Sequence, residues 1–227
     1  MSPAQTSTRT PKKVASSARP PFYALYLAIF LFSLHFALPL YISSSFLATF
    51  VSEKFIGFLY AAEAAFSLLM LMQFPRILQK LGNWRAVLLL IILDALALLG
   101  LAYSKTALII IPAFIATQIF ASLILFNFDV FFEAFSKNRE TGEIRGVMLT
   151  VLNIAILLGP LTAGIILTDG NYSLVYLVAA ALLIPVFFIL GARLKKFEDP
   201  TYKKIPYLLT LKKIIFAGHP NDEIRHA

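Results

Sequence analysis

The chain has 227 residues, of which 59% are hydrophobic and only 14% are charged, and its mean hydropathy is +0.80. Soluble domains carry roughly 25% charged residues, so this composition excludes a soluble domain and identifies an integral membrane protein. The absence of cysteine excludes disulfides, thiol chemistry and thiolate metal sites. The formal net charge of +8 alone would fit a nucleic-acid partner, but the positions of the basic residues explain it differently.

Six apolar segments follow one another along the chain, each close to the roughly 20 residues that cross a bilayer core. Short polar hairpins alternate with longer polar connections between them. The sequence therefore predicts an all-α polytopic membrane protein, with spans at Phe22–Phe46, Phe55–Phe74, Ala86–Tyr103, Thr106–Phe128, Gly146–Leu167 and Tyr172–Gly191.

Composition divides the chain into three regions. Residues 1–21 are rich in Ser, Thr, Pro and basic residues, which predicts a disordered tail. Residues 22–192 form the six-helix transmembrane bundle. Residues 193–227 are a linker, in which 203–218 mix lysines with Ile, Leu, Tyr and Phe. That mixture predicts an amphipathic helix lying on the membrane surface, with a solvated linker as the alternative.

The basic residues set the orientation. If the N-terminus is cytoplasmic, the outer loops hold only Lys54 and Lys105, and the other 18 of the 20 Lys and Arg residues lie on the inner side. This is the positive-inside pattern. We therefore expect both termini in the cytoplasm, a location in the plasma (inner) membrane, and no nucleic-acid partner.

Three ionisable residues, His35, Glu63 and Asp94, fall near the middle of the first three spans. A rise of 1.5 Å per residue puts Glu63 about 12 Å from the outer edge of its span. An ionised carboxylate at such depth costs on the order of 3 kcal/mol or more, so it should face a cavity or a partner. We expect Glu63 to be the proton site, because its neighbouring alanines leave room for water, with Asp94 as the second candidate. His35 would contact a proton or the substrate. For each of the three residues the alternative is a structural role, with a hydrogen bond between helices.

Other polar residues in the spans are candidates for lining a transport path: residues 41–45, Gln118, Asn127 and Asn153. For Asn153 the alternative is a cap on a helix-packing seam. The three histidines lie too far apart for metal-ligand spacing, and no clustered carboxylates are present, so neither a metal nor a cofactor is expected. An enzyme is disfavoured, because the spans hold no Ser/His dyad and the chain has no Gly-rich phosphate loop.

The fifth span reads "RGVMLTVLNIAILLGPLTAG" and carries weak helix formers at its middle. Ala155, Gly159 and Ala163 recur every four positions and line one helix face, with Gly164 beside them. Small residues at this spacing let two helix backbones approach closely in a membrane. Pro160 kinks the helix, and neighbouring helices can satisfy the carbonyl it frees. A generic packing seam is the simplest interpretation.

The longer pattern resembles the fifth-helix antiporter motif of the major facilitator superfamily: Gly, eight residues, Gly, three residues, Gly-Pro, two residues, Gly-Gly. Ala155 and Ala163 replace two of its glycines, and the other positions match by identity at Gly146, Gly159, Pro160 and Gly164. In that family the motif accompanies proton-coupled drug exporters. The resemblance implies a tight, kinked contact of the fifth helix that favours antiport.

The stretch "PRILQKLGNWR" is similar to the loop between the second and third spans of that family, Gly-x-x-x-Asp-Arg-x-Gly-Arg-Arg. Lys80 stands for the first arginine, Gly82 matches, and Arg85 keeps a positive charge nearby. Pro75 and Gln79 replace the glycine and the aspartate, so the charge pair of the family is lost. The resemblance implies a cytoplasmic gate with a weaker or relocated latch.

Acidic residues close the fourth span, and an Arg-Gly pair opens the fifth, as is typical of the family. Asp129, Glu133 and Arg145 are expected to form a cytoplasmic charge cluster that rearranges during transport. A solvated loop is the alternative.

The resemblance implies the first six of the twelve helices of the family's fold, built as two inverted three-helix repeats, with the substrate site near the midplane between two halves. It also implies a secondary active transporter that works by alternating access, with proton-coupled efflux as the expected mode. The partners would be membrane lipid, a small-molecule substrate, protons and a second six-helix half, supplied by a longer chain or a dimer. The alternative is a six-span scaffold, or a degenerate half-transporter, that acts through protein partners.

Overall fold

The computed structural model describes residues 22–136, 141–167 and 170–200. The tail expected over 1–21 and the amphipathic helix expected over 203–218 lie outside these ranges. The described residues are almost entirely helical, in the helices α1 (Phe22–Leu40), α2 (Ser43–Ala48), α3 (Glu53–Leu81), α4 (Asn83–Tyr103), α5 (Ala107–Phe135), α6 (Thr141–Ile166) and α7 (Tyr172–Arg193).

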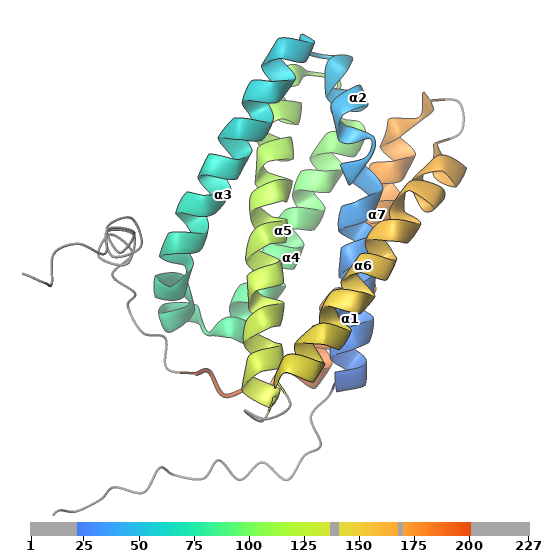
Figure 1. Cartoon of the computed structure of the whole chain (residues 1–227). Helices are drawn as coiled ribbons and strands as arrows, with labels where there is room; N and C mark the ends of the chain where they lie inside the picture. Colours follow the sequence, from blue (N-terminus) through green and yellow to red (C-terminus); the bar gives the residue numbers. More distant parts are fainter. Residues whose placement is uncertain (1–21, 137–140, 168–169, 201–227) are drawn as a thin grey trace, which may run out of the picture.

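Within the described residues, six helical segments are long and apolar enough to cross a membrane, with α1 and α2 together forming the first. Successive spans run in opposite directions along one bundle (Figure 1). The end of the bundle at which α1 begins is called the N-terminal end below. The all-α, six-span architecture predicted from the sequence is confirmed.

The first span is broken, where the sequence predicts one continuous helix. Pro39 has no N–H to donate, so the helix α1 ends at Leu40 and a turn leads to α2. The carbonyl of Pro39 accepts hydrogen bonds from the backbone N–H of Ile42 at 3.0 Å and from Ser43 Oγ at 2.7 Å. These two bonds satisfy the Pro39 carbonyl, which a backbone N–H would have satisfied in a continuous helix.

The second and fourth spans continue seven residues further than their apolar stretches predict. The helix α3 ends at Leu81 rather than Phe74, and α5 ends at Phe135 rather than Phe128. The predicted connection "PRILQKLGNWR" is therefore wrong as a loop, because only Gly82 separates α3 from α4. Hydropathy falls where the chain reaches polar surroundings, but good helix formers such as Gln79, Lys80 and Leu81 carry the helix beyond that point.

The first three spans and the last three spans pack in the same way. The helix α1 packs extensively against α6 and α7, just as α5, the fourth span, packs against α3 and α4. The helices α4 and α7, which correspond to each other, pack together. Because each repeat has three spans of alternating direction, the second repeat is inverted relative to the first. The inverted-repeat architecture of a six-helix half is thus present.

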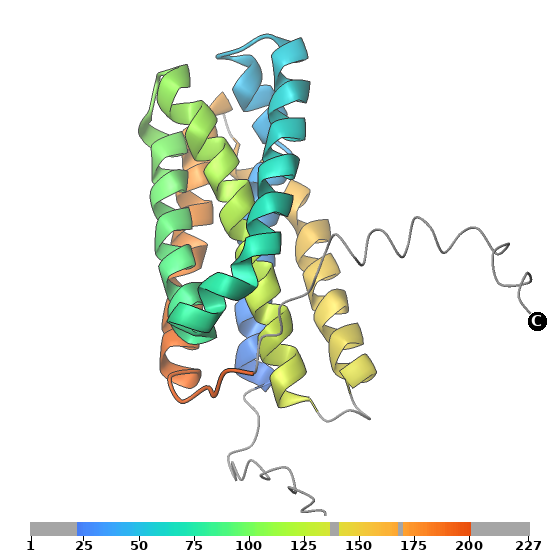
Figure 2. The same cartoon turned by 90° about the vertical axis from the view of Figure 1, so that its left-hand side faces the viewer.

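The helices α3 and α6 hold corresponding places in the two repeats and are the least buried spans. They lie at opposite edges of the bundle in Figure 1, and α6 stands at the edge in Figure 2 as well. Large apolar side chains on them are exposed, among them Phe58, Leu68, Leu157 and Ile165.

One face of α6 makes a very close contact with α1. A Cβ placed on Gly159 would lie 2.6 Å from the Ala37 Cβ and 3.0 Å from the Ala37 carbonyl oxygen, so no side chain fits there. Ala155 and Ala163, one turn away on either side, are buried in the same seam. Gly164, however, has no neighbour within 4 Å of a built Cβ, so the small residues of this helix do not act as one surface.

We predict that Gly159→Leu destabilises the purified chain by about 3 kcal/mol, because the new side chain must displace the backbone of α1. Gly164→Leu is the matched control on the open face and should change stability by less than about 0.5 kcal/mol. Denaturant unfolding in detergent measures both. Equal losses for the two variants would contradict the packing described for α6.

Candidate functional site: a buried His–Asp pair and a capped helix

A histidine and an aspartate meet in the core of the bundle, between α1 and α4. His35 Nε2 lies 3.1 Å from Asp94 Oδ2, and the two side chains are 3% and 0% exposed. The angles of this contact lie outside those of a hydrogen bond, and Asp94 Oδ1 has no hydrogen-bond partner among the described residues. The two residues, which the sequence offered as separate candidates, thus form one buried pair with incomplete hydrogen bonding.

The other ring nitrogen of His35 fixes how the pair can hold a proton. His35 Nδ1 lies 3.2 Å from the carbonyl oxygen of Phe32. A carbonyl can only accept, so Nδ1 carries a hydrogen and donates it. The exchangeable proton is then the one that either His35 Nε2 or the Asp94 carboxyl group carries. With one proton there the pair has no net charge. Losing it leaves an unpaired carboxylate, which is costly in a buried site.

A small cavity of about 20 Å³ adjoins the histidine, lined in part by His35, Ser43, Gln118 and Tyr176. This volume is enough for one water molecule. Ser43 Oγ and the Tyr176 hydroxyl are 3.4 Å apart, so polar groups continue from the pair toward the break in the first span. Gln118 and Ser43, two of the path residues proposed from the sequence, lie at this cavity.

The remaining candidates lie elsewhere in the fold. Glu63 is half-buried on α3, and Asn153 is exposed on α6, where its Nδ2 donates to the Leu149 carbonyl. Asn127 is fully buried, and its Nδ2 donates to its own helix at 2.7 Å. The Asn127 carbonyl also accepts from Asn83 Nδ2 at 3.4 Å. Asn127 therefore joins α4 to α5 inside the core, and that it lines the transport path stays a prediction.

The charge cluster expected before the fifth span is only partly present. Arg145 donates to Glu133 Oε2 at 3.2 Å, and both side chains are well exposed. Asp129 lies one turn earlier on α5 and is half-buried. An exposed pair of this kind contributes little stability, so it can form and break readily.

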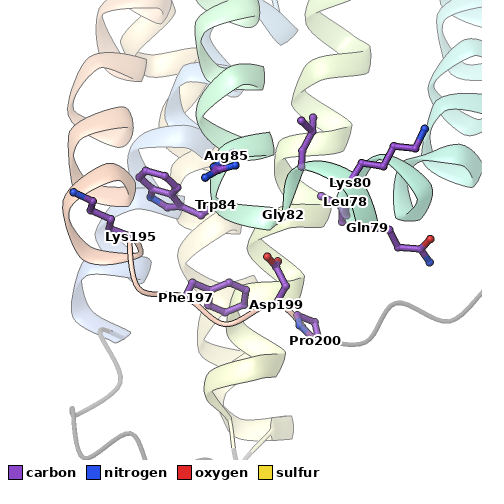
Figure 3. Close-up of a pocket in the computed structure, with 11 residues that line it drawn as sticks. Leu78, Gln79, Lys80, Gly82, Trp84, Arg85, Lys195, Phe197, Asp199 and Pro200 are labelled. Atoms are coloured by element: carbon purple, nitrogen blue, oxygen red, sulfur yellow. The ribbon is translucent and has the colours of Figure 1, made fainter.

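A segment that the sequence did not single out closes the N-terminal end of the bundle. After α7, residues 194–200 fold back beneath α4, and Asp199 Oδ1 accepts a hydrogen bond of 2.7 Å from the backbone N–H of Asn83. The carboxylate also fills the space at Gly82, whose φ is +76° and whose Cβ would lie 2.6 Å from Asp199 Oδ2 (Figure 3). Asp199 thus caps the first turn of α4 from a distant part of the chain.

Aromatic contacts hold this segment in place. The ring of Phe197 packs edge-on against Phe131 and Phe135 of α5, at centroid distances of 4.8 and 5.6 Å. Trp84 Nε1 donates to the Leu190 carbonyl at 3.3 Å, which joins α4 to α7. Together with the Asp199 cap, these contacts tie α4, α5 and α7 to one another at the N-terminal end.

Comparison with known proteins decides the family. The sequence pattern of the Major Facilitator Superfamily matches residues 19–215, which is most of the chain. The chain belongs to the major facilitator superfamily. Comparison with curated proteins gives no match. Members of the superfamily are transporters, and the six apolar helices accordingly make this chain a multi-pass integral membrane protein.

The superfamily loop residues line a cleft of about 740 Å³ at the N-terminal end, together with the 194–200 segment. Gln79, Lys80 and Arg85 are all on its wall, and Gly82 is at its centre (Figure 3). The aspartate of the superfamily motif, replaced here by Gln79, has a counterpart in the Asp199 carboxylate beside Gly82. The relocated latch expected from the sequence therefore has a candidate in Asp199.

The Asp199 contact escaped the sequence analysis because nothing local marks it. The residue lies in a polar stretch after the last apolar span and is 116 positions from its partner. Gly82 is the one signal in the sequence, since its missing side chain leaves space for the side chain of a distant residue.

We predict that His35→Leu and Asp94→Leu each destabilise the chain by about 1–3 kcal/mol, because each leaves the other polar group buried without its partner. The double variant should be more stable than either single one. Unfolding of all four proteins in a double-mutant cycle measures the coupling. Additive losses would contradict a paired arrangement.

We predict that Asp199→Ala releases the 194–200 segment and speeds tryptic cleavage after Lys195 and Lys196 several-fold, because the cap on α4 contributes about 1 kcal/mol. Asp199→Asn keeps an acceptor oxygen and should behave closer to the parent. Glu198→Ala alters the adjacent exposed position and is the matched control. Equal cleavage rates for Asp199→Ala and Glu198→Ala would argue against the cap.

Proposed function

We propose that this chain is the N-terminal half of a secondary active transporter that moves a small molecule by alternating access, driven by protons. The single observation that carries the proposal is the buried His35–Asp94 pair, with 3.1 Å between Nε2 and Oδ2. Ionisable groups at this depth in a membrane are costly, and function is the usual reason for keeping them.

The pair gives proton exchange a physical link to conformation. In the closed core, proton loss would strand an unpaired carboxylate, so exchange requires water to reach Asp94. Such access requires the helices around the pair to move, so we propose that proton transfer and helix movement occur together. Because Asp94 pairs with His35 and Glu63 is half-buried on another helix, the pair replaces Glu63 as our first choice for the proton site.

The direction of transport is proposed as efflux by proton antiport. Its support is the motif on α6, whose Gly159 contacts Ala37, only two residues from His35 on α1. A shift of α6 therefore acts on the part of α1 that carries the proton-binding pair. We also propose that Gly146, Pro160 and Gly164, which are exposed on α6, meet a second six-helix half, from a longer chain or a second copy.

The orientation that we propose puts both termini in the cytoplasm and the protein in the plasma membrane. Its support is the distribution of Lys and Arg, with only Lys54 and Lys105 on the outer side. The charged cleft with Asp199 and the Arg145–Glu133 pair then face the cytoplasm, where they act as the inner gate.

The absence of cysteine makes a substrate-free test possible. Gly57 lies on the open face of α3 at one end of the bundle, and Gly146 lies on the open face of α6 at the other end. A Cβ built at either position meets nothing within 4 Å. Single cysteines there can be labelled with a membrane-impermeant maleimide in proteoliposomes. We predict that, between about pH 6 and about pH 8, one labelling rate rises and the other falls when each is divided by the rate for the same cysteine in the denatured protein at the same pH, which corrects for thiol ionisation.

Asp94→Asn should abolish this opposite shift, whereas Glu63→Gln should retain it. Parallel changes at both cysteines would contradict alternating access. A shift that survives Asp94→Asn but not Glu63→Gln would move the proton site to Glu63.

A further inference from the structure

A cavity of about 170 Å³ lies at mid-depth between α1, α5 and α6. Most of its wall is apolar and partly aromatic, formed by Phe32, Phe36, Leu125, Leu152 and Ile156. The wall also includes two hydroxyl side chains, Ser33 and Ser122. No charged side chain lines it among the described residues. Such a composition, mostly hydrophobic with a few polar groups, is that of a small-molecule site.

The two serines differ in a way that points to a ligand. Ser122 Oγ donates to the Gln118 carbonyl of its own helix at 3.0 Å, as hydroxyls within apolar helices commonly do. Thr117, Thr150 and Thr162 make the same kind of bond, at 2.8 to 2.9 Å. Ser33 does not. It is 3% exposed, and its Oγ has no hydrogen-bond partner among the described residues.

An unpaired hydroxyl in an apolar environment costs about 1–3 kcal/mol, so its presence needs a reason. We infer that the cavity binds an uncharged, ring-sized apolar molecule carrying one hydrogen-bonding group, which pairs with Ser33 Oγ. An apolar cavity of about 150 Å³ accommodates benzene, so this volume suits one aromatic ring with a small substituent. Lipid hydrocarbon could fill the same space but would leave the hydroxyl unpaired.

The position of the cavity connects the ligand to the proposed proton site. The ring of Phe32 lies on the cavity wall and stacks on the His35 ring, with centroids 5.2 Å apart and planes 22° apart. Phe32 also supplies the carbonyl that accepts from His35 Nδ1. A ligand that pushes on Phe32 therefore acts on the pair. The inference names the substrate class of the proposed transporter and rests on that function.

Binding can be measured without transport, by fluorine NMR of small probes with the full chain in nanodiscs and with empty nanodiscs as the blank. The probes are para-fluorobenzyl alcohol, para-fluorotoluene, and the charged para-fluorobenzoate and para-fluorobenzylammonium ions. We expect the alcohol to bind most tightly and the two ions not to bind. Equal affinity of the alcohol and the toluene would mean that hydrocarbon fills the cavity, and binding of the ions would also overturn the inference.

Ser33→Ala should weaken binding of the alcohol about five- to tenfold, the value of one hydrogen bond, and leave the toluene unchanged. Ser122→Ala removes the neighbouring hydroxyl, which is already paired, and should alter neither. Ile156→Trp fills the cavity from its more exposed side and should abolish both. Unchanged alcohol affinity in Ser33→Ala overturns the inference even if the cysteine-labelling shift is intact. Conversely, alcohol binding that follows this pattern without a labelling shift upholds the site and refutes the transport cycle.

Discussion

A bilayer core offers no hydrogen-bond partner, so the protein itself must satisfy every polar group that the chain places there. Most of the structure follows this constraint. All spans are helices, the break after Pro39 is repaired by Ser43, and the hydroxyls of α5 and α6 bond back to their own helices. Asn127 does the same within the core. Among the described residues, a few buried side-chain atoms nevertheless have no hydrogen-bond partner, and they include both oxygens of Asp94 and the hydroxyl of Ser33.

The proposed proton site and the proposed ligand site meet at one helix. The helix α1 contributes Ser33 to the mid-depth cavity, His35 to the pair with Asp94, and Ala37 to the close contact with Gly159 of α6. All three lie within five consecutive residues. In the proposed cycle a small ligand, a proton and the packing of α6 would therefore act on the same stretch of α1, just before the turn that breaks the span. Coupling among them needs no long-range pathway, because they share a single element that can move.

Hydropathy was enough to predict six spans, because the length and apolar character of a span are local properties, whereas the inverted three-helix repeats were expected only from the resemblance to the family. It could not predict where helices end beyond the bilayer, so α3 and α5 came out too short. His35 and Asp94 could be singled out by their depth, but their pairing could not be predicted, since it depends on how the helices that carry them are placed in the bundle. Depth alone also could not show that Glu63 is half-buried on α3, whereas Asn127 is hydrogen-bonded inside the core. Ser33 had no sequence signal, and the only signal for Asp199 was Gly82, a distant residue, because the chain near Asp199 does not mark the contact.

The central claim is that Asp94 exchanges a proton in the working cycle of the protein. Infrared difference spectroscopy of the chain in lipid, titrated between about pH 5 and pH 8, reports carboxyl protonation directly. The account predicts a carboxylic-acid band that changes with pH, is absent in Asp94→Asn, and shifts in frequency in His35→Leu while surviving Glu63→Gln. A spectrum in which every titrating carboxyl band survives Asp94→Asn would contradict it.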